Sequence, residues 1–503
     1  MRVLLTLVPT LAIAIAPALW HDLFRTYIRS PDPDLIFAYQ ALALNDGDAR
    51  VNAEHTGYIY FVILAWTLRA ARALGFITAD RIGALAGLDG TSFDVSFAQV
   101  IFTGRILSMV EAAAFVVLVF GAVRFMSGAR MPAALVALLT AGSLGIAIQG
   151  SLMRTEFLSA LFAYATFVSL YIAARQGFVG NGVWMAVAGL CAALAMAAKV
   201  QAIFPLLAIP ALMLAMGTPA PRDTSTTGPN ERRLALALLM LLTTIVTLPA
   251  CVMLVAGIGA RGSSGLYQSA IALYVCAAFA LYRAFYPMPT ERWVSGLTAL
   301  ALGFSAGLLV HLIYPNPPAV DAIAAPIEHM MVYSKLSAAP TTGIPVAAMI
   351  EIAGNAATEA LARRLSLTPI VALEAAIIVG SVMTWRAQDR QTAVGAAAML
   401  GIVLWLETMF GFRFMNSEYL VYTDPWRATA LALIFRSLAL RFVPEWRRVF
   451  AATVFVAVAA IDTSHLSQAF RPDFIRYQPA SDACGQAKGY LPKLVHQFAK
   501  FCA

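Results

Sequence analysis

The chain has 503 residues, of which 60% are hydrophobic and only 12% charged, and its mean hydropathy is +0.76. Soluble domains carry roughly 25% charged residues, so this composition excludes an ordinary soluble protein. The formal net charge is +8. The basic residues stand singly at the ends of apolar segments, which indicates membrane topology and excludes a nucleic-acid-binding patch.

The apolar runs are continuous and approach the ~20 residues that a helix needs to cross a bilayer. A chain in hydrocarbon must satisfy its backbone polar groups internally, and continuous apolar runs favour helices over a barrel. We therefore predict an all-α polytopic membrane protein. Residues 3–20 form the first run. A cleaved signal peptide is also an apolar run with small residues near its end. This run is long, however, and the chain behind it stays in the membrane, so we predict a retained helix.

Residues 21–98 form the first polar interval, and its first part, 21–56, is acidic. Within this interval, residues 57–75 are apolar but are interrupted by Arg69 and Arg72. Aromatic side chains in the same segment suit the headgroup region of a membrane. We predict an interfacial helix that lies on the membrane, because a span at this point would invert every later segment.

Later apolar segments are predicted to span the membrane at 99–123, 132–150, 157–174, 183–198, 201–216, 234–256, 265–282, 293–313, 368–385, 392–411, 427–442 and 449–461. Together with the first helix they make about thirteen transmembrane helices. A second long polar interval covers 314–367. The predicted organisation is a membrane domain over 1–461 and a polar tail over 462–503.

Arginine placement gives the orientation of these spans. With a cytoplasmic N-terminus, the inside loops carry Arg124, Arg130, Arg175, Arg222, Arg232, Arg233, Arg283, Arg292, Arg386, Arg390, Arg441, Arg447 and Arg448. The short outside loops hold far fewer basic residues, namely Arg154, Arg261, Arg413 and the borderline Lys199 and Arg427. Basic residues are concentrated in cytoplasmic loops of membrane proteins. The intervals 21–98 and 314–367 and the C-terminal tail are therefore predicted to lie outside.

The first outside loop contains a candidate catalytic carboxylate, Asp34. It follows a proline and precedes Leu35, Tyr39 and Leu42 at helical spacing, with Asn45-Asp46-Gly47 as a stop signal. One interpretation is that Asp34 caps this helix. The other is that it takes a proton from an acceptor hydroxyl at the membrane surface. The two roles are compatible.

Three further sites of polar residues are predicted at the outer membrane surface. Lys199 lies between predicted helices of about 16 residues, or roughly 24 Å, which is shorter than the ~30 Å hydrocarbon core. A lysine at such depth either faces a cavity or an anion, or extends to the headgroups. Arg154-Thr155-Glu156 is predicted to form a tight outside turn. Its charged side chains either pair in a local salt bridge or contribute to a phosphate site. His55 precedes a glycine turn. It is either an ordinary histidine of the membrane interface or a residue that contacts a phosphate or a sugar.

The ensemble resembles the GT-C membrane glycosyltransferases, which use polyprenyl-phosphate sugars. The resemblance rests on PDPDLIFAYQALALNDGD, AEHTGYIYFVILAW, GRILSMVEAAAFVVLV, GSLMRTEFLSALFAYATFVSLYIAARQG and AGLCAALAMAAKVQAIFPLL. It covers roughly residues 1–216, and the later half shares only the helical layout. The large first outside loop is also similar to that of the bacterial lipid A aminoarabinose transferases and protein mannosyltransferases. The latter have adjacent Asp and Glu, whereas Asp32 and Asp34 are separated by a proline, so the identity of the base stays open, with Asp34 favoured.

The resemblance implies inverting transfer of a sugar from a polyprenyl-phosphate donor to a glycan, lipid or protein acceptor at the outer face of a bacterial inner membrane. It implies these site residues: Asp34 and Asp32 for catalysis; Lys199, Arg154 and His55 for the donor phosphate; Tyr39, Tyr58, Glu156, His329 and Tyr422 for substrate. No cofactor is expected besides the lipid-linked donor; no acidic cluster demands a metal, although the sequence is compatible with a divalent ion. Membrane lipids are expected partners, and nucleic acid is not.

Two other classes compete with this interpretation. A transporter of lipid-linked substrates would show breaks or charges in matched halves, and the sequence has no internal repeat. An O-antigen ligase or polymerase carries its large outside loop late in the chain, whereas the acidic loop follows the first helix. Cys484 and Cys502 are the only cysteines outside the apolar spans, and their predicted extracytoplasmic position favours a disulfide.

Overall fold

The computed structural model describes residues 4–21, 32–48, 57–175, 182–216, 290–314, 368–411, 417–470 and 488–501, with isolated residues between these ranges. The predicted spans at 234–256 and 265–282, most of the loop 314–367, and both Cys484 and Cys502 lie outside the described residues. All regular elements of the described part are helices. This agrees with the all-α membrane class predicted from composition.

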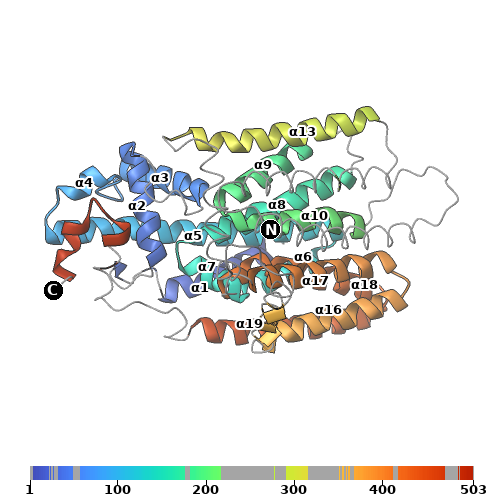
Figure 1. Cartoon of the computed structure of the whole chain (residues 1–503). Coiled ribbons are helices and arrows are strands. Elements are labelled where there is room, and N and C mark those ends of the chain that lie inside the picture. Colours follow the sequence, from blue (N-terminus) through green and yellow to red (C-terminus); the bar gives the residue numbers. More distant parts are fainter. Residues whose placement is uncertain are drawn as a thin grey trace.

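Long helices lie side by side along one common direction (Figure 1). They are α1 (Leu4–His21), α5 (Gly90–Ser127), α8 (Thr155–Arg175), α9 (Gly182–Ala198), α10 (Ile203–Met216), α13 (Thr290–Leu308), α16 (Thr368–Arg386), α17 (Arg390–Gly411), α18 (Asp424–Ala439) and α19 (Pro444–Ala469). Within the described part, five helices are long and apolar enough to cross a membrane, or six if one bent pair counts as a span. The number thirteen stays a prediction.

Two predicted spans differ in form from the helices observed. The segment 132–150 is not one helix but α6 (Arg130–Ala141) and α7 (Leu144–Ser151), which are bent by 55°. The Ser143 hydroxyl accepts a hydrogen bond from the Ile146 amide at 3.3 Å, so a new helix begins after the bend. The segment 99–123 lies inside the 38-residue α5, which at about 57 Å exceeds the ~30 Å hydrocarbon core and extends beyond it.

The described part of the predicted first outside loop folds into a small helical layer, the first-loop layer, with its own apolar core. This core joins α2 (Asp32–Asp46), α3 (Tyr58–Ala73), α4 (Ile82–Ala86) and the start of α5, separately from the core of the main bundle. Helix α2 ends as predicted, at Gly47, whose φ of 80° is favourable only for glycine. The helix predicted over 57–75 is present as α3, but its placement on the membrane plane stays a prediction.

The C-terminal segment packs on this layer. Leu491, Leu494 and Phe498 are fully buried in its core, and the segment ends in the 3-10 helix η6 (Val495–Phe501). Phe498 makes edge contacts with Phe93 and Phe97 at centroid distances of 5.7 and 5.9 Å. The first-loop layer therefore supplies an apolar surface that covers these side chains.

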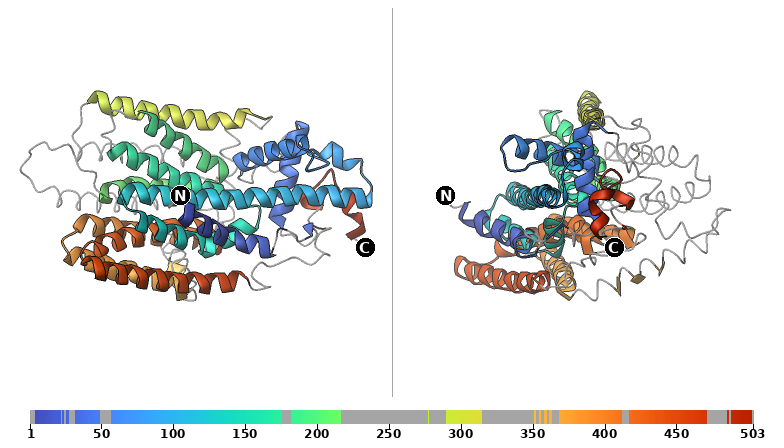
Figure 2. Two further views of the ribbon diagram at one scale, coloured as in Figure 1. Left: turned by 180° about the vertical axis from the view of Figure 1, so that it is seen from behind. Right: turned by 90° about the vertical axis from the view of Figure 1, so that its left-hand side faces the viewer.

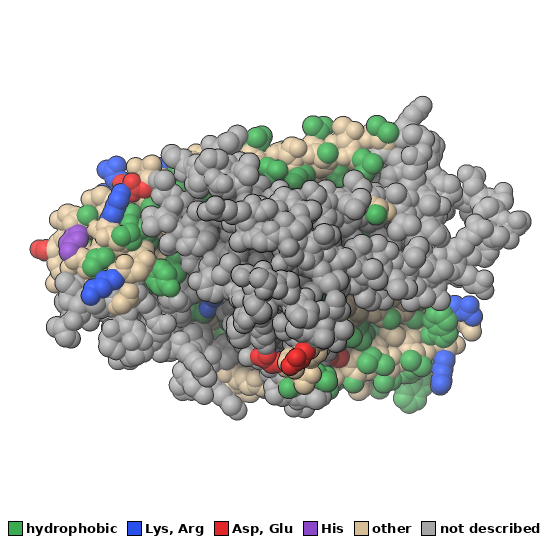
Figure 3. Space-filling model, viewed as in Figure 1, with side chains coloured by type: hydrophobic (Ala, Val, Ile, Leu, Met, Phe, Trp, Pro, Cys, Tyr) green, Lys and Arg blue, Asp and Glu red, His purple; other side chains and the backbone are tan. Residues whose placement is uncertain are grey.

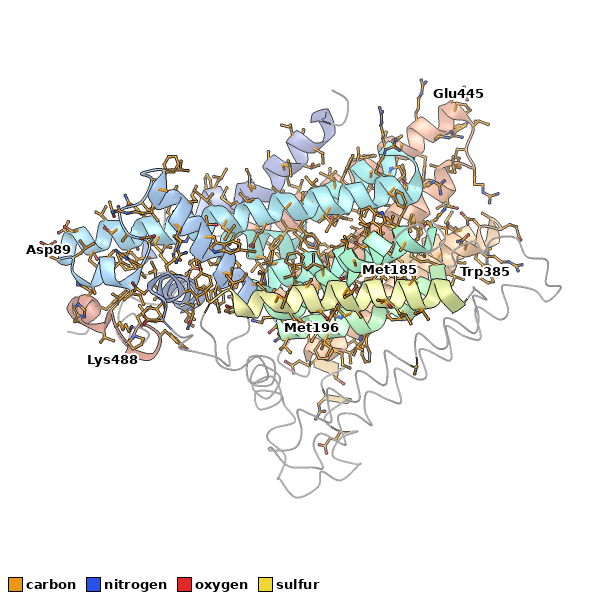
Figure 4. The ribbon with its side chains drawn as sticks, turned by 90° about the horizontal axis from the view of Figure 1, so that it is seen from above. Asp89, Met185, Met196, Trp385, Glu445 and Lys488 are labelled. Atoms are coloured by element: carbon orange, nitrogen blue, oxygen red, sulfur yellow. The ribbon has the colours of Figure 1, made fainter. Side chains whose placement is uncertain are left out.

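Segments predicted to share one side of the membrane lie at the same end of the molecule. Asp89 and Lys488 lie at one end, whereas Trp385 and Glu445 lie at the other (Figure 4). The view from behind also shows the first-loop layer at the end of the molecule opposite to the end of α16 and the start of α19 (Figure 2). On the face in Figure 3, basic side chains gather at the two ends, and hydrophobic ones lie between them along α13 and α16.

Candidate functional site

Residues 152–156, which link α7 to α8, form the meeting point of the polar residues identified in the sequence. We call them the central turn. Contacts reach it or its flanks from α2, from the start of α3, from the middle of α5 and from the tip between α9 and α10. All these elements lie where the first-loop layer joins the bundle (Figure 1).

Asp34 is held on both of its carboxylate oxygens. Oδ1 accepts a hydrogen bond from the Met153 amide at 3.0 Å, and Oδ2 accepts from Nε and Nη2 of Arg105, both at 3.2 Å. The side chain is 0% exposed. The prediction that Asp34 precedes and caps its helix is wrong: α2 begins at Asp32, and the described partners of Asp34 lie on α5 and on the central turn.

Three of the roughly four lone-pair positions of the Asp34 carboxylate are used by these contacts. The remaining position is on Oδ1, the oxygen that faces the central turn. A proton acceptor at that point is held in a fixed orientation by the guanidinium behind it. The arrangement suits a general base that must meet its substrate from the side of the central turn.

Arg105 was missed as a site residue by the sequence interpretation. Its GRILS segment contributed only to the resemblance, although a single arginine inside an apolar span is by itself a sign of a functional partner. The preceding Gly104 has a packing role, because a Cβ at this position would clash with the Met153 side chain. Gly104 thus lets the central turn approach α5 closely enough for the Met153 amide to reach Asp34.

Glu156 brings Lys199 and Arg154 together. Lys199 Nζ lies 2.7 Å from Glu156 Oε1, with side-chain exposures of 15% and 2% respectively. The charge of Arg154 also acts on the Glu156 carboxylate. The Ser159 hydroxyl donates to the Ala195 carbonyl at 3.1 Å, which fixes α8 against α9 below this cluster. Two cations therefore act on one carboxylate at the central turn.

The start of α3 reaches the same place. His55 lies outside the described residues, but Gly57 has a φ of 135° and a Cβ there would clash with Thr155. Only glycine combines this backbone conformation with such close approach. The segment that follows His55 therefore lies directly against the central turn.

Other predicted substrate residues occupy different surroundings. The Tyr39 hydroxyl accepts a hydrogen bond from the Lys493 amide at 3.4 Å, which ties it to the C-terminal segment. Tyr58 is buried in the first-loop core. Tyr422, on η5 (Ser417–Tyr422), is buried in the bundle core with its ring centroid 5.2 Å from that of Phe410. These three roles stay predictions.

For two more predicted site residues the side chain is not among those described. His329 lies outside the described residues. Asp32 is the first residue of α2, and its side chain is not among those described. In the described part of the chain, no group of three His, Cys, Asp or Glu residues could hold a metal ion. The sequence-based expectation about metals stays a prediction.

Comparison with known proteins identifies the fold. Neither a protein-family model nor a curated protein sequence matches the chain. The apo oligosaccharyltransferase of Archaeoglobus fulgidus is similar in structure, with a TM-score of 0.50 and 11% identity over 99% of this chain. The oligosaccharyltransferase AglB of the same organism, in complex with an inhibitory peptide and a dolichol-phosphate, gives a TM-score of 0.49 and 12% identity. The chain spans 59% of the length of each. The chain therefore shares its fold with this archaeal oligosaccharyltransferase, in agreement with the all-α membrane fold predicted from the sequence.

Proposed function

We propose that this protein is an inverting glycosyltransferase that moves a sugar from a polyprenyl-phosphate donor to a glycan, lipid or protein acceptor. The observation that carries the proposal is convergence at the central turn. Asp34, Gly57, Arg105 and Lys199 come from separate parts of the chain and meet around this turn, which itself carries Glu156.

The donor phosphate would bind at the Lys199 side of the central turn. Lys199 and Arg154 are both partly exposed, and their combined charge exceeds that of Glu156. The donor phosphate is a diester with one negative charge, and the polyprenyl phosphate that leaves is a monoester with more negative charge, so charge-assisted hydrogen bonds from the two cations favour the leaving group. During transfer, negative charge grows on the departing phosphate, and fixed cations stabilise it without reorganisation. His55 is expected to assist from its place just before Gly57.

Asp34 would act as the base. The proton of the acceptor hydroxyl moves to Asp34 Oδ1, the acceptor oxygen attacks the anomeric carbon, and the bond from that carbon to the phosphate oxygen breaks. Polyprenyl phosphate leaves with the bonding electrons, and the single displacement inverts the configuration. Arg105 keeps the carboxylate oriented through two hydrogen bonds to Oδ2.

The same proposal places the site at the extracytoplasmic face of a bacterial inner membrane. The first loop and the C-terminal segment lie at the end of the molecule that arginine placement predicts to be outside. The N-terminus would then be cytoplasmic and the C-terminus extracytoplasmic. The acceptor, a glycan or an exposed glycolipid, would reach the central turn from that side.

Purified protein in lipid nanodiscs provides the test. Labelled undecaprenyl-phosphate glucose, mannose and arabinose serve as probe donors, with cell-envelope glycolipid extract as acceptor. We expect release of undecaprenyl phosphate together with a labelled glycolipid from at least one donor. Lys199→Ala should weaken binding of undecaprenyl phosphate by about tenfold, equivalent to roughly 1.4 kcal/mol. Lys488→Ala, an exposed lysine at the C-terminal segment, serves as the control and should bind normally.

Two results would overturn the proposal. Movement of the probe donor across vesicle membranes without bond formation indicates a transporter. Transfer only from diphosphate-linked oligosaccharides, with none of the three monophosphate donors consumed, indicates a ligase or polymerase of the O-antigen type.

A further inference from the structure

Helix α13 presents apolar side chains to its surroundings up to the end that faces the first-loop layer. Leu302, Leu309 and Ile313 are exposed, on α13, on the 3-10 helix η3 (Leu309–Leu312) that continues it, and just after η3. In a polytopic membrane protein such a surface contacts acyl chains. The end of this helix therefore marks the level at which acyl chains give way to headgroups.

Tyr314, the next residue, is tied to α2 and α3. The guanidinium carbon of Arg69 lies 5.7 Å from the centroid of the Tyr314 ring. The Tyr314 hydroxyl donates to Asn45 Oδ1, and Arg69 donates to the Asn45 carbonyl, both at 3.5 Å. Asn45 Nδ2 in turn donates to the carbonyls of Ala65 and Asp80. These contacts hold the C-terminal half of α3 at the end of α13 (Figure 1), and hence at the headgroup level.

Three apolar side chains are exposed on this part of the chain. Trp66 on α3 is 50% exposed, and Leu74 and Phe76, which follow the helix, are 70% and 72% exposed. Single exposed apolar residues are ordinary in proteins. These three, however, stand close together in the sequence, at the end of a lipid-facing helix. Tryptophan is enriched where headgroups meet acyl chains, and apolar side chains enter the same boundary.

Two exposed arginines accompany these apolar side chains. Arg69 and Arg72 donate to main-chain carbonyls, of Asn45 and of Ile77, at 3.5 and 3.3 Å. Neither takes part in the ion pairs formed among the described residues. A guanidinium has five N–H donors, so donors of both arginines remain for a ligand. Phosphate oxygens match this planar group in charge and geometry.

We propose that Trp66, Arg69, Arg72, Leu74 and Phe76 form an anchor surface that binds anionic phospholipids. The lipids belong to the leaflet on the side of the first-loop layer. The two guanidinium groups hold the headgroup phosphate, and the apolar side chains lie against the upper part of the acyl chains. The predicted interfacial position of α3 assigned no ligand to this end of the helix.

The anchor surface is separate from the candidate transfer site. The central turn meets α3 at the opposite end, where Gly57 lies against Thr155. The phospholipid at the anchor surface is a ligand that is not consumed. The inference therefore goes beyond the proposed function and does not depend on it.

Photolabelling of the full-length protein provides the test. The protein is placed in phosphatidylcholine nanodiscs that contain a trace of phosphatidylglycerol with a photoreactive group near the headgroup, and labelled positions are mapped by mass spectrometry. We expect labelling of residues 66–76, competed by unlabelled phosphatidylglycerol and not by further phosphatidylcholine. Arg69→Gln and Arg72→Gln should each lower this labelling about fivefold, which corresponds to roughly 1 kcal/mol for each arginine near an anionic membrane.

The matched control is the double variant Arg386→Gln with Arg448→Gln. It removes two exposed arginines at the other end of the molecule, so it has the same net charge as the Arg69→Gln, Arg72→Gln double variant. Labelling of 66–76 should be unchanged in the control. Thermal unfolding in detergent identifies any variant that fails to fold, and the competition on the wild type decides independently of the variants.

Three results would overturn the inference. Absence of label from 66–76 would mean that this surface does not face the membrane. Equal competition by phosphatidylglycerol and phosphatidylcholine would mean that it has no preference for anionic headgroups. Competition by undecaprenyl phosphate but not by phosphatidylglycerol would assign the two arginines to a polyprenyl phosphate instead of a phospholipid. None of these outcomes depends on whether sugar transfer is observed.

Discussion

Two buried arginines organise the two halves of the described chain, and they differ in the acidic partners that the described residues supply. Among these residues, Arg105 pairs with Asp34. Arg427, on α18, binds three: Glu374 of α16 through Nε at 3.0 Å, Glu407 of α17 through Nη2, and Asp424 through Nη1 at 3.0 Å. The first pair lies at the central turn, whereas the second lies inside the bundle.

The difference separates a site from a structural junction. Each guanidinium nitrogen of Arg427 donates to a carboxylate, and Asp424 Oδ2 also accepts from the Gly145 amide at 3.1 Å. This network joins α16, α17 and α18 to α7, the short helix that leads into the central turn. At Asp34, by contrast, the described residues leave one acceptor position on Oδ1, which the proposed function assigns to the acceptor hydroxyl. A buried charged group whose hydrogen-bonding positions are all occupied by protein holds helices together. A buried carboxylate with an unoccupied acceptor position can in addition bind a substrate.

The largest expected effect is loss of the bundle in Arg427→Met. This change leaves the acids around Arg427 without their shared cation in a buried region, and breaking a buried ion pair costs about 3–5 kcal/mol. We expect aggregated protein or a steep fall in the midpoint of thermal unfolding in detergent. Arg448→Met, at an exposed position of α19, is the control. A normal unfolding midpoint for Arg427→Met would contradict a structural role for this cluster.

Asp34→Asn should show the opposite balance, with a greater loss of turnover than of stability. An asparagine keeps an acceptor for Arg105 but lacks basicity, so turnover should fall by about 10²-fold or more while the protein remains folded. The measurement is single-turnover release of undecaprenyl phosphate, with Asp89→Asn at an exposed position as control. Near-normal release in Asp34→Asn would exclude it as the base and direct attention to Asp32.

Gly57→Ala should disturb the site through its backbone. A residue with a side chain at a φ of 135° carries strain of about 1–3 kcal/mol, and the new Cβ would clash with Thr155 of the central turn. We expect a lower unfolding midpoint together with weaker binding of undecaprenyl phosphate. Gly87→Ala is matched, because a Cβ there meets no atom within 4 Å and the backbone is not left-handed. Equal behaviour of the two variants would mean that the close contact at Gly57 does not shape the site.

The sequence was sufficient for some of these features and not for others, for physical reasons. Asp34, Lys199 and Glu156 could be identified because charged residues next to apolar spans are costly and hence informative. Their convergence could not, since Asp34 and Arg105 are 71 positions apart and no local pattern encodes the pair. Arg427 was counted as a borderline loop residue, although it lies inside the bundle. The bend at Gly142 was also missed, because an apolar run gives no sign of where a helix changes direction.

The smallest expected effect concerns the C-terminal segment, where apolar and ionic contacts act together. Lys493 pairs with Asp48 at the surface, with side chains 55% and 30% exposed. The hydrogen bond to Asp48 raises the pKa of Lys493. A raised pKa means that this contribution to stability is present at neutral pH and is lost as pH rises above the ordinary lysine value of about 10.5.

Because exposed pairs are screened, Lys493→Ala should cost no more than about 0.5 kcal/mol at low salt and nothing measurable at high salt. Thermal unfolding at pH 8 and pH 11 checks this: the wild type and variant should differ slightly at the lower pH and coincide at the higher one. A large difference at pH 8 that disappears at pH 11 would mean that the ionic contact, rather than the buried Leu491, Leu494 and Phe498, holds the segment to the first-loop layer.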